Sequence, residues 1–558
     1  HIVESCPLDP TLLQRQRDKI EAISGEDIEI HIADSRYSHA HALAKSAIRH
    51  RGRIGATTTD HIDRLVLDRY LGVPVFLFVM YLMFMFTINI GGAFIDFFDQ
   101  LGEAVFVDGI SNALGALHAP QWLQVVLASG VGGGLQIVAT FIPIITALYL
   151  FLSFIEDSGY MARAAFVMDR FMRSIGLPGK AFVPLIVGFG CNVPAVMATR
   201  TLENERERKL TILMNPFMSC GARLPVYALF AAAFFLQNGQ NLVFLLYLIG
   251  ILVAILTGMI MKQSLLSGVS SGFMLELPSY HMPTLKGIAL HTWDRVRHFI
   301  RDAGRTIVLM VVVLNVLNSM GADGSFGNQE TDKSLLAVVS QQLTPVFAPM
   351  GIHEDNWPAV LGIVTGILAK EVVVSTLDTL YSQIDEEQGL TDASASQSFG
   401  DKLRNAAATI PANLGLLGNR LADPLAMDVG DLSDHSSAAE AQQVHTRTFG
   451  AMTSRFDGQA GAFAYLLFIL LYFPCVATIA AIRREAGVSW AVFVAFWTTA
   501  MAYSVASGYY QIATWSEHSA FSTAWILGTF ALLGATVFSL RKWARRGLTM
   551  PLAERSTR

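Results

Sequence analysis

Long apolar runs, some of them broken by polar or helix-breaking residues, constrain this sequence more than any other feature. About 20 predominantly apolar residues are needed for a helix to cross a bilayer, and such runs recur along the 558-residue chain. Hydrophobic residues make up 52% of the chain and charged residues only 15%, which is unusual for a soluble protein of this length. The sequence therefore predicts an all-α polytopic membrane protein.

We predict eight transmembrane helices, at about residues 73–97, 134–155, 210–236, 242–261, 306–320, 462–482, 489–512 and 523–540. Two further apolar stretches, 180–201 and 359–380, are interrupted by Gly, Pro or charged residues, and we interpret them as re-entrant hairpins. Broken helix is tolerated inside a membrane only where protein buries it or where it lines a cavity. The breaks therefore mark the expected site of function.

The basic residues give an orientation for these helices. They cluster before the first span, after the fourth and after the last, so both termini are expected in the cytoplasm. With eight crossings, the two hairpins then enter from opposite sides. Each half of the chain contains a span, a hairpin and a Cys-bearing span, and weak local similarity links 190–196 to 368–374 and 219–222 to 474–477. This order is typical of transporters with inverted repeats and a site near the midplane.

The predicted organisation has five parts. They are a cytoplasmic helical linker region (1–70), the first repeat and the start of the second (71–380), a polar extracytoplasmic insertion (381–459), the remainder of the second repeat (460–541) and a cytoplasmic basic tail (542–558). The insertion is expected to be a mobile loop or a small cap. Because the chain opens on His1 and shows no signal-peptide pattern, we expect it to begin inside a longer polypeptide.

Three of the four cysteines, Cys191, Cys220 and Cys475, lie in the interrupted apolar segments. Four cysteines do not make a disulfide framework for a chain of this length. Cys220 and Cys475 occupy equivalent points of the two repeats, and paired thiolates suit a soft or borderline divalent metal. The alternative is that each cysteine is a small buried apolar residue.

Cys191 and Asn192 stand at the tip of the first hairpin. There Gly188 and Gly190 are expected to allow unusual backbone dihedrals, and Pro194 removes a backbone donor. Freed carbonyl groups and the Asn192 amide would then meet a cation, unless this segment is only a turn that packs helices. Beside the other two cysteines, Pro225 and Pro474 are assigned the same structural role.

Charged residues inside or beside the apolar runs are candidates for gating. Lys370 and Glu371 are neighbours, and because neighbouring helical residues point about 100° apart, each needs its own partner. Arg223 is a plausible counter-charge for Glu371, in a gating role or in a purely structural ion pair. Glu156 and Asp157 are expected to form a polar mouth below the first hairpin, or an ordinary solvated helix end.

No histidine falls inside a predicted span, which argues against an imidazole-rich metal site. No Gly-x-x-x-x-Gly-Lys-Ser/Thr sequence is present either, so these residues contain no phosphate-binding loop of the nucleotide-hydrolysing type. The formal net charge of -5 gives no reason to expect nucleic-acid binding.

Several motifs, in order, resemble the bacterial ferrous iron transport protein B (FeoB) family. They are the segments 156–166 (EDSGYMARAAF), 188–195 (GFGCNVPA), 218–225 (MSCGARLP), 369–373 (AKEVV) and 472–475 (YFPC). Near the start, 33–37 and 59–64 resemble the helical domain that links the GTPase domain of this family to its membrane part. The resemblance covers nearly the whole chain.

The resemblance implies a transporter that imports ferrous iron across the bacterial inner membrane through two gate motifs, whose cysteines match Cys191, Cys220 and Cys475. It implies that GTP and Mg²⁺ act only through a GTPase domain expected ahead of these residues, so that the chain itself is not an enzyme. The implied partners are the lipid bilayer, Fe²⁺, that GTPase domain, small cytoplasmic Feo proteins and a possible second copy of the chain.

Two other functions remain open. The hairpin plan is also similar to that of sodium-coupled nucleoside carriers, in which polar hairpin tips bind an organic solute. The other alternative is a receptor or an assembly platform, in which the broken helices would serve only to pack against other helices. Retained activity after joint replacement of Cys220, Cys475 and Glu371 would favour that last reading.

Overall fold

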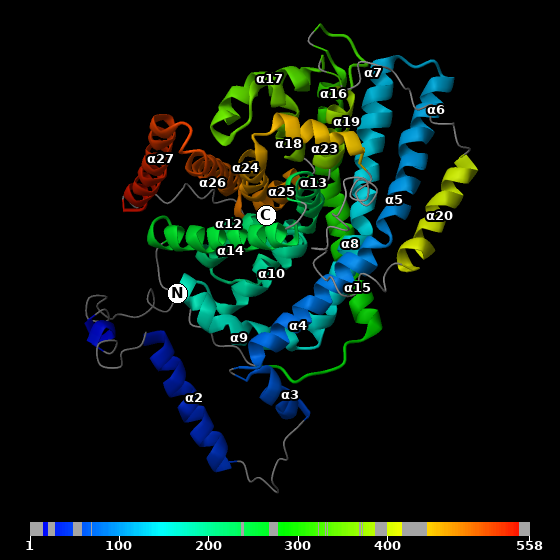
Figure 1. Cartoon of the computed structure of the whole chain (residues 1–558). Coiled ribbons are helices and arrows are strands. Elements are labelled where there is room, and N and C mark those ends of the chain that lie inside the picture. Colours follow the sequence, from blue (N-terminus) through cyan, green and yellow to red (C-terminus); the bar gives the residue numbers. More distant parts are fainter. Residues whose placement is uncertain are drawn as a thin grey trace, which may run out of the picture. The chain divides into compact units, whose positions relative to one another are not determined.

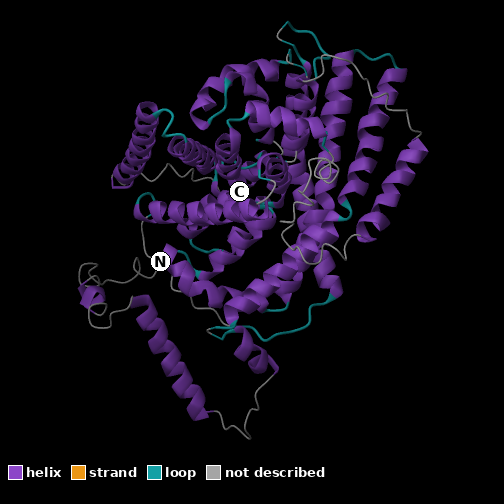
Figure 2. Ribbon diagram, in the orientation of Figure 1, coloured by secondary structure: helices purple, strands orange, loops and turns teal. Residues whose placement is uncertain are grey.

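The structure is a computed structural model that describes residues 15–19, 28–47, 58–68, 70–235, 239–266, 277–321, 323–329, 331, 333–367, 370, 372–384, 399–415 and 444–545. Within these residues the regular elements are helices (Figure 2). Contacts divide the chain into two units, one with the described residues up to Leu65 and one with those from Val66 onward. The first unit contains helix α2 (Ile28–Ala47) and most of α3 (Thr58–Val66). The described part of the predicted linker region is therefore helical.

Seven helices in the described part of the chain are long and apolar enough to cross a membrane. They are Gly72–Ala116, Gln121–Asp157, Glu205–Phe234, Gly239–Gln263, Gly458–Ala486, Val488–Ala513 and Ser519–Lys542. This confirms the fold class of an all-α polytopic membrane protein. The predicted span at 306–320 is not among the seven. It coincides with α16 (Arg305–Ser319), which continues from α15 (Leu285–Phe299) through the π-helical turn η8 (Ile300–Gly304).

The first two of these helices extend further than the sequence suggested. The first joins α4 (Gly72–Met85), η1 (Phe86–Ile90), α5 (Ile95–Gly102), η2 (Glu103–Asp108) and α6 (Gly109–Ala116). The second joins α7 (Gln121–Gln124), η3 (Val125–Gly132) and α8 (Gly133–Asp157). Helices α5 and α8 lie side by side (Figure 1). The predicted end near Phe97 is therefore too early, and Gln136 of α8 donates to Asp99 at 2.8 Å, so that this carboxylate is accommodated within the helix pair.

Each of the two predicted hairpins is a pair of short helices. After α9 (Tyr160–Ile175) and η4 (Gly179–Ala181), the first consists of α10 (Phe182–Gly190) and α11 (Asn192–Ala198), followed by η5 (Thr199–Thr201). Between α16 and the second hairpin lie α17 (Leu335–Phe347), η9 (Ala348–Met350) and η10 (Glu354–Asn356). The second hairpin consists of α18 (Trp357–Gly366) and α19 (Val372–Ile384). Lys370 is described in its break, whereas Glu371 lies outside the described residues.

The two Cys-bearing spans are broken as well. The first comprises α12 (Glu205–Met214), η6 (Asn215–Phe217), η7 (Gly221–Arg223) and α13 (Leu224–Phe234), and the second comprises α24 (Gly458–Leu471) and α25 (Val476–Ala486). Helix α11 of the first hairpin contacts α25, and α19 of the second contacts α13. Each hairpin therefore packs against the Cys-bearing span of the other half. The remaining long helices are α14 (Gly239–Gln263), α26 (Val488–Ala513) and α27 (Ser519–Arg545).

An aromatic cluster joins the two Cys-bearing spans. The ring of Phe230 in α13 lies 4.9 Å from that of Tyr465 in α24, and Phe456 packs edge-on against both at 5.3 and 5.5 Å. The three side chains are almost fully buried. Aromatic pairs at such separations contribute roughly 0.5–1.5 kcal/mol each beyond the area that they bury. They hold α13 and α24 together and so fix the separation of the two breaks.

The described parts of the predicted insertion are helices. Helix α20 (Phe399–Gly415) contacts α5, with Lys402 paired to Asp108 at 2.5 Å and Asn413 donating to Asp96 at 2.8 Å. Helix α23 (Thr446–Arg455) contacts α13 and α19 and buries Phe449. The described residues of this segment are therefore helical and packed against other helices, and the expectation of a mobile loop or a small cap stays a prediction.

Candidate functional site: three cysteines at helix breaks

Each of the three cysteines has extended backbone and directly precedes a helical segment. Cys191 (φ -156°, ψ 130°) separates α10 from α11, Cys220 (φ -82°, ψ 160°) precedes η7, and Cys475 (φ -55°, ψ 152°) precedes α25. All three are free thiols, each partly exposed. The first N–H groups of a helix lack intrahelical partners. The breaks therefore place each thiol beside backbone N–H groups that have no acceptor within their own helix, and at Cys475 the N–H of Val476 donates to the Ile367 carbonyl oxygen instead.

The tip of the first hairpin is held by an asparagine pair. With its amide oriented to satisfy both acceptors, Asn192 donates to the carbonyl oxygens of Asn215 at 3.0 Å and Gly188 at 3.2 Å. A Cβ on Gly188 would lie 3.1 Å from the Asn215 side-chain oxygen, so a close approach requires this glycine. Neither Gly188 nor Gly190 has positive φ. The expectation that they supply unusual dihedrals is therefore wrong, and Gly190 has ordinary space around it.

The structure brings together the two spans that carry Cys220 and Cys475, because α13 contacts α24. The Cys475 thiol lies 3.1 Å from the hydroxyl of Thr478. Ser219, beside Cys220, shares a hydrogen bond of 3.0 Å with Tyr227. In this region hydroxyl groups therefore accompany the thiols of both breaks.

Arg223 and Lys370 are buried in the same region. Arg223 is fully buried and donates to the carbonyl oxygens of Met218 at 3.3 Å and Pro216 at 3.1 Å, which closes the break around Cys220. Lys370 donates to the Ile469 carbonyl oxygen at 3.3 Å. The expected pairing of Arg223 with Glu371 lies outside the described residues.

The predicted prolines occupy positions that cost no helical hydrogen bond. Pro194 is the third residue of α11, Pro225 is the second residue of α13, and Pro474 directly precedes Cys475. The N–H groups of a first helical turn have no intrahelical acceptor, so proline is tolerated there. These residues favour the breaks without weakening the helices that follow.

Glu156 at the end of α8 and Arg163 of α9 each contact a later segment. Glu156 pairs with Arg295 of α15 at 2.6 Å, and Asp157 is the last residue of α8. Arg163 of α9 is fully buried, donates to the Pro278 carbonyl oxygen at 2.5 Å and lies over the Tyr280 ring. Glu156 is therefore part of an interhelical ion pair and not only of a solvated helix end.

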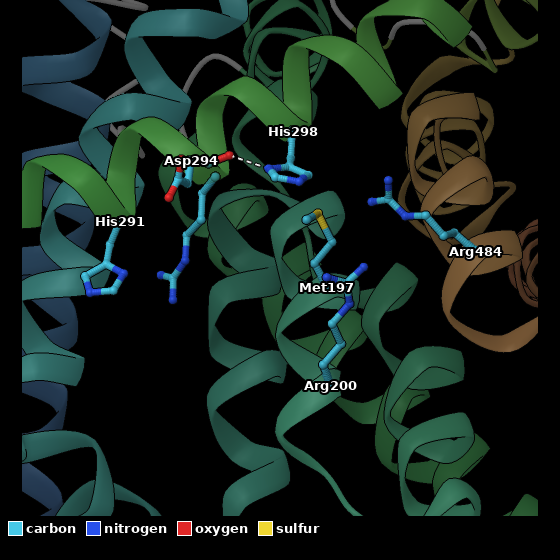
Figure 3. A pocket seen from close by; sticks show the side chains of 7 residues that line it. Met197, Arg200, His291, Asp294, His298 and Arg484 are labelled. Atoms are coloured by element: carbon cyan, nitrogen blue, oxygen red, sulfur yellow. Dashed lines mark hydrogen bonds between the residues drawn. The ribbon is translucent and has the colours of Figure 1, made fainter. Parts of the chain in front are cut away.

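Sequence reasoning missed a cavity of about 280 Å³, whose lining side chains are drawn in Figure 3. It is lined by Met197, Arg200, His291, Asp294, Arg295, His298 and Arg484. Arg200 forms a bidentate pair with Glu485, with Nε 2.8 Å from one carboxylate oxygen, and this hydrogen bonding raises the pKa of Arg200. Arg484 pairs with Asp302 of η8. The guanidinium of Arg295 lies 5.6 Å from the Tyr149 ring.

The cavity lies against the first hairpin, because Met197 of α11 and Arg200 of η5 line it. The only sequence signal for it was the clustering of basic residues at the ends of apolar runs. Tyr472 and Asn215 were also missed. The sequence pattern could have identified Asn215, since it is a polar residue before a proline inside an apolar run.

Among the residues that the structure describes, no three His, Cys, Asp or Glu side chains form a cluster that could hold a metal ion. In this conformation a cation in the region would depend on backbone carbonyl, hydroxyl and amide oxygens together with the thiols.

Comparison with known proteins identifies the family. A family model described as "Nucleoside recognition" (Gate) matches residues 138–234 and 300–489, "Ferrous iron transport protein B C terminus" matches 243–295, and "FeoB cytosolic helical domain" matches 2–49. No solved structure matches the chain.

The relatives carry one name. A protein named Fe(2+) transporter FeoB from Legionella pneumophila is 47% identical over 504 residues, which cover 90% of this chain and 65% of the relative. The proteins of that name from Salmonella typhi and from Salmonella typhimurium (strain LT2) are each 44% identical over 546 residues, covering 97% of this chain and 68% of the relative. The chain thus spans somewhat under two thirds of the length of the Legionella relatives. It belongs to the FeoB family.

Proposed function

We propose that this chain forms the membrane path of a ferrous iron importer in the bacterial inner membrane. The observation that carries the proposal is the position of Cys191, Cys220 and Cys475, each at an extended residue that breaks a helix in the membrane domain. Membership of a family whose relatives are named Fe(2+) transporters supports iron as the cargo.

In this proposal Fe²⁺ passes between the Cys220 and Cys475 thiols, and Asn192 and freed carbonyl groups of the first hairpin take part near Cys191. Thiolates alone would favour zinc or copper, because Fe²⁺ ranks low in the affinity series of divalent metals. Mixed thiol and oxygen ligands are a better match for Fe²⁺. Selectivity then depends on the geometry that the hairpins impose.

The cavity in Figure 3 is the proposed inner end of the path. Arg200 ends the first hairpin, Glu485 and Arg484 end the Cys475 span, and Asp302 belongs to η8, so their pairs connect three segments at one place. Rocking of the first hairpin would break the Arg200–Glu485 pair. Glu156 and Asp157 form the polar mouth beside it, and Arg223, Lys370 and Glu371 are the proposed gating charges.

Several parts of the proposal concern the intact protein. GTP and Mg²⁺ would act through a GTPase domain ahead of residue 1, and the helical region matched at 2–49 would transmit its motion. Both termini are placed in the cytoplasm, and the two halves are proposed as inverted repeats. Small cytoplasmic Feo proteins and a second copy of the chain are proposed partners.

The test is anaerobic uptake of radioactive iron by cells that lack their own Fe²⁺ importer and express the full-length protein. We expect uptake above that of cells with the empty vector, and a Cys191→Ser variant with normal membrane expression to lower it. Uptake no higher than in the empty-vector cells would overturn the proposal.

The family description "Nucleoside recognition" over both halves favours one second candidate, a sodium-coupled carrier of a nucleoside-like solute. Sodium-dependent uptake of a radiolabelled nucleoside by the same cells, unaffected by Cys191→Ser, would support that function instead.

A further inference from the structure

Asn215 has a fully buried side chain whose amide makes no hydrogen bond. Both amide atoms, Oδ1 and Nδ2, are buried and lack a hydrogen-bond partner, and the residue is 0% exposed. A buried polar group without a partner is costly, and most such groups in native proteins are paired. Asn215 begins η6 shortly before Cys220, and η6 contacts both helices of the first hairpin. The unpaired amide therefore lies where the hairpin meets the first Cys-bearing span.

The neighbouring Asn192 does not supply the missing partner. With its amide oriented to donate, Asn192 forms hydrogen bonds to the main-chain oxygens of Asn215 at 3.0 Å and Gly188 at 3.2 Å. The Asn215 main-chain oxygen also accepts from the N–H of Met218 at 3.0 Å, which uses its second lone pair. The two N–H donors of Asn192 are therefore taken up by main-chain oxygens.

The absence of a side chain at Gly188 lets both amides approach the same place on α10. A Cβ on Gly188 would lie 3.1 Å from Oδ1 of Asn215 and 3.4 Å from the end of the Asn192 amide. The carbonyl oxygen of Gly188 lies beside them, within reach of Asn192. Two side-chain amides and two main-chain oxygens therefore gather at the tip of the first hairpin.

Rotation of the Asn192 amide would make this place a set of oxygens. A half-turn exchanges the amide nitrogen and oxygen, so Oδ1 would then lie 3.0 and 3.2 Å from the two main-chain oxygens. Oxygens that face each other in this way repel unless a cation lies between them. A separation of about 3.0 Å is that of neighbouring oxygens around an octahedral divalent ion with metal–oxygen distances of about 2.1 Å. Carbonyl oxygens also suit harder divalent ions than thiolates do.

We propose that the side-chain oxygens of Asn192 and Asn215, with the main-chain oxygens of Gly188 and Asn215, form a binding site for a divalent cation. In the present conformation the Asn192 amide donates into this site and fills it. When the amide oxygen turns inward, a cation replaces the two hydrogen bonds and the Asn215 amide gains a partner. The inference rests on the proposed function, because it places the site on the iron path next to Cys191.

A purely structural role for Asn215 makes a different prediction. The hydrogen bond from Asn192 goes to the main-chain oxygen of Asn215, which every residue at this position has. Leucine is similar to asparagine in size and shape and buries no unpaired polar atom. If the Asn215 side chain served only packing, Asn215→Leu would therefore leave iron uptake unchanged.

The first experiment compares stability with transport in the full-length protein. Asn215→Leu should keep or raise the melting temperature in detergent, because it removes an amide without partners. Anaerobic Fe²⁺ uptake at equal membrane expression should nevertheless fall by about tenfold or more, the usual cost of disturbing a metal site. Normal uptake by Asn215→Leu overturns the inference.

Asn356→Leu is the matched control for this comparison. Asn356 is also fully buried, but its amide is hydrogen-bonded to Tyr381 and to the Arg455 carbonyl oxygen. Its replacement leaves these partners unsatisfied, so the melting temperature should fall. Uptake per folded protein should stay at the wild-type level.

A second measurement follows binding and does not depend on transport. Purified full-length protein is titrated anaerobically with Mn²⁺, which prefers oxygen ligands, and bound Mn²⁺ is counted by electron paramagnetic resonance. Wild type and Asn356→Leu should each bind one equivalent more than Asn215→Leu, because sites elsewhere in the protein are common to all three. Equal stoichiometry in wild type and Asn215→Leu overturns the inference.

The two proposals fail separately. If wild-type uptake does not exceed that of the empty-vector cells while Mn²⁺ binding depends on Asn215, the oxygen site is correct and iron import is wrong. If uptake needs Cys191 while neither uptake nor Mn²⁺ binding responds to Asn215→Leu, only the oxygen site is wrong.

Discussion

The backbone N–H of Val476 donates to the carbonyl oxygen of Ile367 at 3.1 Å, which joins the break of the second hairpin to the start of α25. Two tyrosines add to this link, since Tyr465 of α24 and Tyr472 directly after it donate to carbonyl oxygens of α18 at 3.0 and 3.4 Å. Helix α18 and the Cys475 span are therefore cross-linked along their length. We expect them to move as one body, with the relative motion occurring at the first hairpin.

The contact between Gly366 and Tyr472 should be intolerant of added volume. A Cβ at Gly366 would overlap the Tyr472 hydroxyl and lie 2.6 Å from a methyl group of Val373. Gly366→Ala should therefore destabilise the protein by about 1–3 kcal/mol. Thermal unfolding in detergent measures this, and Tyr472→Phe in the same chain should restore part of the loss. If the stability changes of the two substitutions were fully additive in the double variant, the proposed contact between these residues would be contradicted.

The two glycines of the first hairpin should respond differently to the same change. A Cβ at Gly188 would crowd Asn215 and Met218, whereas at Gly190 the nearest atoms lie 3.8 Å away. Gly188→Ala should lower stability and iron uptake, because it disturbs the Asn192 contacts. Gly190→Ala should be near neutral in both assays. Equal effects of the two substitutions on stability and uptake would show that crowding at Gly188 does not cause them.

The Arg200–Glu485 pair should control access to Cys191. The Arg200 side chain is half-exposed, and Arg484, 3.7 Å from the nearly buried Glu485 carboxylate, remains when Arg200 is removed, so Arg200→Ala should change the free energy of unfolding by only about 1 kcal/mol. It should nevertheless speed the reaction of Cys191 with a membrane-impermeant thiol reagent applied to the protein in detergent, because the first hairpin is released. Arg173→Ala removes an ion pair within α9, to Asp169, and serves as the control. Similar rates in both variants would exclude a latch at Arg200.

Part of this site could be predicted because its signals are local. A glycine, asparagine or proline inside an apolar run predicts a broken helix wherever the rest of the chain lies, and the breaks at Cys191, Cys220 and Cys475 follow from that. The resemblance of the motifs also predicted the family.

The remaining features depend on residues far apart in sequence. Gly188 is needed because Asn215 approaches it closely. Arg200 forms its ion pair with Glu485, which lies 285 positions later in the sequence. The length of the first two helices depends on π-helical turns and on polar pairs such as Gln136 with Asp99. Local patterns carry no record of such contacts, so the cavity and the cross-links of α18 had to come from the structure.

The central claim is that thiols at the helix breaks take part in the iron path, and anaerobic Fe²⁺ uptake by cysteine variants of the full-length protein tests it most directly. Cys220→Ser and Cys475→Ser, singly and together, would be compared with Cys6→Ser at equal membrane expression; Cys6 lies outside the described residues. The account predicts a strong loss of uptake in the span variants, with the double variant little worse than either single one, and normal uptake in Cys6→Ser. Unchanged uptake in the double variant would contradict the account.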